Sequence, residues 1–215
     1  MIQIEKDRIR KTIPKVMDAL KKRKFDPYFF ETSNQARHFI VERIEPQETV
    51  GIGGSVTFRE ELGIVESLRK RGNEVCDHWD ASKDRVRRLE LKRKQRGMDV
   101  FLSSVNAMTS EGILVNLDGG GNRVAGMCSG PKKVIVAAGT NKIVDSLDLA
   151  IHRTRHQAAV INAMRLKRKT PCVETGVCID CDSPERICSA LLILLKKPND
   201  IDLFTVVLIN EEMGY

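Results

Sequence analysis

Residues 49–72 read TVGIGGSVTFREELGIVESLRKRG, and the class of the fold follows from this segment. The short apolar run at 49–52 is typical of a buried strand. A glycine-rich turn at 51–55 then leads into a periodic segment, 57–71, which Gly72 ends as a helix stop signal. A strand that passes through a tight turn into a helix is the repeating unit of a parallel sheet with crossover helices.

The same alternation recurs outward from this unit in both directions. It predicts an α/β fold with an open, mostly parallel sheet flanked by helices. The N-terminal helical segment, 1–24, is expected to kink or break at Pro14, and one domain follows over 25–215. The expected strands are 28–30, 49–52, 74–76, 99–103, 112–116, 133–138, 190–195 and 204–209, and the main expected helices are 2–23, 32–43, 57–71 and 145–168.

Composition excludes several classes of protein. The chain has 215 residues, of which 41% are hydrophobic and 30% charged, which is ordinary for a globular protein and excludes a disordered one. Its longest apolar run, 190–195, falls far short of the ~18 residues of a membrane helix. The first residues contain no apolar signal segment. We therefore expect a soluble, cytoplasmic protein that does not enter a membrane.

The net charge is +7. The basic runs lie near the ends of predicted helices, where cations complement the helix dipole. Aromatic residues make up only 5% of the chain and no nucleic-acid reader motif is present. The charge thus favours an anionic small ligand over specific binding of nucleic acid.

Two glycine-rich loops and one lysine follow predicted strands, where open α/β sheets bind ligands. Glycines let the backbone approach a ligand, and a helix N-terminus presents free N–H groups to phosphate or carboxylate. The alternative interpretation of the first loop, at 51–55, is an ordinary tight turn. The alternative for the second loop, at 118–123, is a hairpin loop. The candidate ligand-binding residues are Gly53, Gly54, Ser55, Thr57, Asp118, Gly119, Gly120, Gly121, Asn122, Arg123 and Lys142.

Glu111 is the candidate catalytic carboxylate of this site. It precedes a predicted strand, so we expect its side chain at the mouth of the sheet, where partial desolvation would suit a general base or nucleophile. The alternative is an ordinary surface glutamate.

Four of the six cysteines fall in segment 172–188, with the spacing C-x5-C-x2-C-x6-C. A C-x2-C pair allows two thiolates to bind one metal from a tight turn. Four such ligands suit either a tetrahedral zinc site or a four-iron cluster, and the alternative is a set of reduced thiols. Ser183-Pro184 predicts a helix start that would turn the last cysteine into a core. The candidate metal ligands are Cys172, Cys178, Cys181 and Cys188.

Three segments carry a family resemblance: GIGGSVTFREELGI (51–64), SVNAMTSEGILVNLDGGGNRVAGMCSGPKKVIVAAGTNKIV (104–144) and TPCVETGVCIDCDSPERIC (170–188). They resemble the LUD, or lactate-utilisation, domain family, and more closely its stand-alone, cysteine-tailed members. The resemblance implies a NagB/RpiA/CoA-transferase-like fold. It also implies an association with lactate oxidation to pyruvate beside an iron–sulfur LUD partner subunit.

Two functions follow as expectations. The first is a protein of 2-hydroxy-acid metabolism that binds an anionic ligand at the glycine-rich loops. The second is a non-catalytic subunit or redox-linked protein that holds zinc or an iron–sulfur cluster in its cysteine segment. The chain lacks the ferredoxin-type cysteine run, and both functions are compatible with a homo-oligomer.

Overall fold

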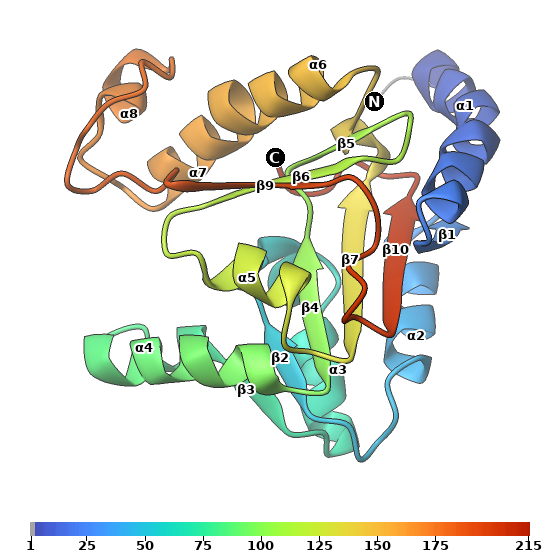
Figure 1. Ribbon diagram of the computed structural model, residues 1–215, viewed down its shortest axis with the longest axis horizontal. Helices are drawn as coiled ribbons and strands as arrows, with labels where there is room; N and C mark the ends of the chain where they lie inside the picture. The colour runs from blue at the N-terminus through green and yellow to red at the C-terminus, as the bar shows by residue number, and fades with distance from the viewer. Residues whose placement is uncertain (1–2) are drawn as a thin grey trace.

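The structure is a computed structural model that describes residues 3–215, and its centre is a six-stranded sheet (Figure 1). Every neighbouring pair in this sheet is parallel, in the order β1-β10-β7-β4-β2-β3. This arrangement confirms the predicted α/β class. The strands are β1 (Asp26–Phe30), β2 (Val50–Ile52), β3 (Val75–Asp77), β4 (Val100–Ser104), β7 (Lys133–Gly139) and β10 (Leu203–Ile209).

A second, four-stranded sheet lies beyond the carboxyl ends of β4, β7 and β10, toward which their arrowheads point in Figure 1. Its order is β8-β5-β6-β9, with β5 and β6 forming an antiparallel hairpin. Strands β5 and β8 could not be predicted from the sequence, because two or three residues are too few to show a period. The strands are β5 (Ala107–Thr109), β6 (Leu114–Asp118), β8 (Ile143–Val144) and β9 (Ala190–Leu194).

Helices cover both faces of the large sheet. Along β4, Phe101 packs into one hydrophobic cluster while Val100 and Leu102 pack into another on the opposite face. Burial on both faces explains why these strands are apolar throughout. The α-helices are α1 (Gln3–Lys22), α2 (Ser33–Glu42), α3 (Ile64–Arg71), α4 (Arg85–Lys94), α5 (Asn122–Cys128), α6 (Leu147–His152), α7 (Ala159–Arg165) and α8 (Pro171–Thr175).

Helix α1 continues across Pro14 as one helix, so of the two alternatives expected there, a kink or a break, the break is wrong. Its apolar stripe includes Ile13, Val16 and Leu20, which are buried in one core cluster with β7 and β10. This burial offsets the backbone hydrogen bond that the proline removes.

Two predicted helices contain π-helical turns. The segment expected as one helix over 57–71 is a π-helical turn, Thr57–Glu61, followed by α3. The long helix expected over 145–168 consists of α6, the π-helical turn Arg153–Ala158 and α7. Such turns are rare in proteins, but those that occur are often found at functional sites. Residues of both turns line the pocket described below.

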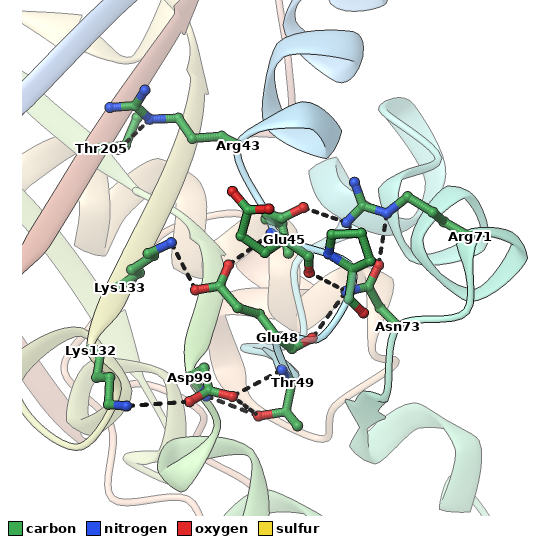
Figure 2. A network of polar contacts seen from close by, with 12 residues as sticks. Arg43, Glu45, Glu48, Thr49, Arg71, Asn73, Asp99, Lys132, Lys133 and Thr205 are labelled. Atoms are coloured by element: carbon green, nitrogen blue, oxygen red, sulfur yellow. Dashed lines mark hydrogen bonds and ion pairs between the residues drawn. The ribbon is translucent and has the colours of Figure 1, made fainter.

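A polar network closes the amino ends of the parallel strands (Figure 2). Asn73 Nδ2 donates to the backbone oxygens of Glu45 at 2.8 Å and Glu48 at 3.0 Å. Asp99 Oδ2 accepts from Thr49 N at 3.0 Å and from its hydroxyl at 2.7 Å. These contacts hold the loops that enter β2, β3 and β4, so the opposite, carboxyl end of the sheet is the one left open.

None of the helices in residues 3–215 has the length and apolar composition of a membrane span.

Candidate functional site

A cavity of about 860 Å³ opens beyond the carboxyl end of β2, between the large sheet and the small one. The first glycine-rich loop forms one wall, and the β6–α5 loop forms another. Residues 158–168 and the cysteine segment complete it. Ten of the candidate ligand-binding residues line this one cavity: Gly53, Gly54, Ser55, Thr57, Asp118, Gly119, Gly120, Asn122, Arg123 and Lys142.

The cavity is strongly basic. Among the described residues that line it, eight cationic side chains face only two carboxylates, those of Asp118 and Glu185. A low-dielectric cleft lined by one sign of charge concentrates the opposite sign. The cations are Arg85, Arg88, Lys92, Arg123, Lys142, Arg165, Arg168 and Arg186.

Lys142 is the most buried of these cations, with 2% of its surface exposed. It ends the 3-10 turn Thr140–Lys142 that follows β7, so the strand delivers it directly to the cavity. Desolvation, and then repulsion from Arg153 and Arg123, lower the pKa of Lys142 from 10.5 to about 7. Attraction to Glu61 opposes this shift and is the smallest of the four influences. Near neutral pH, Lys142 is therefore divided between its charged and neutral forms.

Arg123 lies in the first turn of α5, a helix that was not predicted from the sequence. Its Nη2 donates to Asn106 Oδ1 at 2.9 Å and to the backbone oxygen of Leu117. Asp118 anchors the same loop, because its carboxylate accepts from Arg123 N at 2.7 Å and Gly120 N at 3.1 Å. The Asp118 carboxylate thus holds the loop in place through these hydrogen bonds. Burial lowers the pKa of Arg123.

The first glycine-rich loop brings backbone close to the cavity. Gly54 has φ of +74°, and a Cβ there would lie 2.8 Å from His78 Cε1. Ser55 Oγ accepts from Phe58 N at 3.3 Å and so caps the π-helical turn. The loop leaves no room for a larger residue at position 54.

His78 and Trp79 are among the cavity residues that were not predicted from the sequence. His78 Nδ1 lies 3.1 Å from Gln95 Oε1, and burial lowers the pKa of this histidine. The guanidinium groups of Arg59 and Arg165 lie 4.7 and 5.5 Å from the Trp79 ring centre. The one available signal was that Trp79 is the single tryptophan of the chain.

Glu111 and Gly121 do not line the cavity. Glu111 is exposed on the turn between β5 and β6, where its backbone oxygen accepts from Arg23 Nε at 2.6 Å. Its expected position at the mouth of the sheet is wrong, because the unpredicted strand β5 makes a hairpin that carries Glu111 to the end of α1.

The four tail cysteines line a second, smaller cavity beside the first. They are free thiols, each partly buried. The helix expected after Ser183 does not form, so its predicted effect on Cys188 is wrong. Within residues 3–215, no group of three or more His, Cys, Asp or Glu side chains is arranged to hold a metal ion.

The sequence pattern that defines the LUD domain matches residues 13–209. The chain belongs to the LUD domain family. Family membership supports a function associated with lactate utilisation in general terms. No functionally curated protein matches this LUD domain. The match begins inside α1 and includes every cavity-lining residue except Gly214 and Tyr215.

The fold of this LUD domain is similar to the crystal structure of a DUF162 family protein from Deinococcus radiodurans. The TM-score is 0.50, with 12% sequence identity over 94% of this chain and 98% of that chain. At this identity the likeness is one of fold alone. It agrees with the α/β architecture expected from the sequence.

Proposed function

We propose that this LUD domain binds a small organic anion of the 2-hydroxy-acid class in the basic cavity. The observation that carries the proposal is the convergence of three cations, Lys142, Arg123 and Arg153, of which Lys142 is almost fully buried. Burying like charges together is costly unless an anion joins them. Of the three, Lys142 and Arg123 line the cavity, and a carboxylate is an anion of suitable size to join an ammonium and a guanidinium.

The rest of the cavity supplies hydrogen-bonding groups for the hydroxyl oxygen that lies next to the carboxylate of such a ligand. Ser55 and Thr57 bring hydroxyl groups, and Asn122 brings a side-chain amide. The backbone of Gly53 and Gly54 lies open at the same wall. A carboxylate with a hydroxyl on the adjacent carbon would use both the cationic and the neutral donors.

Binding of an anion should be coupled to uptake of a proton by Lys142. With the cavity empty, the pKa of Lys142 is about 7, so above that pH the side chain is mostly neutral. A bound carboxylate favours the charged form and raises this pKa. Affinity should therefore fall by up to about tenfold for each pH unit above 7, because the proton becomes scarcer.

Isothermal titration calorimetry with L-lactate, pyruvate and inorganic phosphate tests the proposal. The Lys142→Met variant should bind the preferred anion at least about tenfold more weakly at pH 6. Lys22→Met, which removes an exposed lysine at the end of α1, is the matched control and should bind as wild type does. Unchanged affinity in Lys142→Met would overturn the assignment. The assignment would also be overturned if the wild type bound none of the three anions.

A further inference from the structure

Helix α4 presents two cations to the basic cavity without a counter-ion. Arg88 and Lys92 lie four residues apart on this helix, so they share one face, and both line the cavity. Two cations of α4 that do not line the cavity are paired with glutamates, Arg87 at 3.0 Å and Lys94 at 2.7 Å. Within residues 3–215, no carboxylate forms an ion pair with Arg88 or Lys92. Like charges at this spacing destabilise a helix unless something offsets their repulsion.

A third cation reaches the same part of the cavity from another wall. Arg168 follows α7 and lines the cavity, and its buried Nε has no hydrogen-bond partner among the described residues. Figure 1 shows α4 and α7 on opposite sides of the β6–α5 loop. Desolvation lowers the pKa of Lys92, and attraction to Asp118 opposes this shift. Repulsion from Arg88 and Arg168 lowers the same pKa further, so both guanidinium groups lie near the Lys92 ammonium.

The two carboxylates of the cavity are engaged with backbone groups. Asp118 accepts from Gly120 N at 3.1 Å and from Arg123 N at 2.7 Å. Glu185 Oε2 accepts from Lys169 N at 3.0 Å. Half-buried cations that lack a paired carboxylate are costly to gather. This wall of the cavity is therefore suited to an anion from solution.

This group of cations is distinct from the group around Lys142. The charges that act chiefly on Lys142 and those that act chiefly on Lys92 share no residue. A cavity of about 860 Å³ is of the size that holds drug-sized ligands, and a small 2-hydroxy acid fills only part of it. The cavity therefore has room for a second anionic group, beside α4 and the turn after α7.

The number and type of these cations favour linked phosphates over a carboxylate. Guanidinium groups bind phosphate through paired hydrogen bonds, and an ammonium binds it as a compact charge. A single phosphate group carries at most about two negative charges near neutral pH, fewer than the charges of Arg88, Lys92 and Arg168 together. Two linked phosphates carry more charge and present oxygens along a greater length, which suits cations that come from two separate elements.

We propose that Arg88, Lys92 and Arg168 form a second anion site, which binds the diphosphate group of a ligand. The glycine-rich β6–α5 loop borders this site, because a Cβ on Gly120 would lie 3.3 Å from Lys92 Nζ. The site is additional to the one proposed for a 2-hydroxy acid, and it stands whether or not Lys142 binds such an acid.

Isothermal titration calorimetry with pyrophosphate tests the proposal, in about 150 mM salt to screen non-specific attraction. The wild type should bind pyrophosphate at least about tenfold more tightly than inorganic phosphate. Arg88→Met and Lys92→Met should each weaken pyrophosphate binding by at least about tenfold. Failure of the wild type to bind pyrophosphate would overturn the proposal, whatever the result with L-lactate, and so would equal affinity for the two phosphates.

Two further variants locate the bound pyrophosphate. Lys94→Met is the matched control, because this lysine of the same helix lies outside the cavity, and it should bind pyrophosphate as the wild type does. An equal loss in Lys94→Met and Lys92→Met would indicate an effect of net charge and would refute the site. Lys142→Met should retain pyrophosphate binding. Its loss there, with binding intact in Lys92→Met, would place the diphosphate beside Lys142 and contradict a second site. Circular dichroism of each variant shows that it has folded.

Discussion

Arg123 Nη2 donates a 2.9 Å hydrogen bond to Asn106 Oδ1, and this contact joins the start of α5 to the strand-to-strand connection after β4. The same oxygen of Asn106 accepts from Leu117 N at 2.9 Å. One amide oxygen therefore holds both the guanidinium and the strand beside it. The position of Arg123 in the basic cavity depends on Asn106.

Replacing Asn106 should destabilise the fold. Asn106→Leu leaves a partly buried guanidinium and a backbone N–H without their acceptor, so the free energy of unfolding should fall by about 1–3 kcal/mol in urea titrations. Asn34→Ala is the control, because it removes an exposed hydrogen bond to Arg37 at 3.1 Å. It should cost less than about 0.5 kcal/mol. Equal losses in the two variants would contradict this role.

Lys142 should make stability depend on pH. Its pKa falls from 10.5 in the unfolded chain to about 7 in the folded one. Between these values the unfolded state binds more protons, so the free energy of unfolding should rise with pH, and below about pH 7 the full cost remains. Lys142→Met removes this dependence.

The gain from Lys142→Met over wild type should be larger at pH 6 than at pH 9, by about 2–3 kcal/mol. Chemical denaturation at the two pH values measures the difference, and Lys22→Met should show none. A gain that is the same at both pH values would refute the shifted pKa.

Two glycines allow backbone strain to be separated from steric conflict. Gly54 and Gly121 have φ of +74° and +75°, so alanine is strained at either position. A Cβ at Gly121 meets nothing within 4 Å, whereas at Gly54 it meets the His78 ring at 2.8 Å. Gly121→Ala should cost about 1 kcal/mol. Gly54→Ala should cost about 1–3 kcal/mol more, as overpacking does. Thermal unfolding of both variants checks this order.

A buried ion pair supports the Trp79 side of the cavity. Asp77 is fully buried and pairs with Arg59, and its Oδ1 accepts from Trp79 N at 2.9 Å. Asp77→Ala leaves the arginine unpaired and should cost about 3–5 kcal/mol. Glu66→Ala breaks the exposed pair with Lys70 and should leave the free energy of unfolding almost unchanged, because solvent screens that pair. A loss below about 1 kcal/mol for Asp77→Ala in urea titrations would show that the pair contributes little.

Much of the candidate site follows from the sequence because its residues stand next to strand ends. Gly53, Gly54 and Ser55 follow β2, and Lys142 follows β7, so parallel pairing alone brings them to one edge of the sheet. The predicted position of Glu111 is wrong because it depends on a strand that could not be predicted. The three-residue strand β5 has no visible period, and without it the hairpin that removes Glu111 from the cavity could not be foreseen.

Local patterns were sufficient for the α/β class, the order of the long elements and the loops that could contact an anion. The period of apolar residues and the positions of glycines act over a few residues, and such information is present in the chain before it folds. The burial of Lys142 beside Arg123 and Arg153, and the convergence of Cys172 with Cys188, depend on contacts between distant segments. Only the folded chain decides these, because desolvation and charge repulsion arise when folding brings side chains from separate elements together.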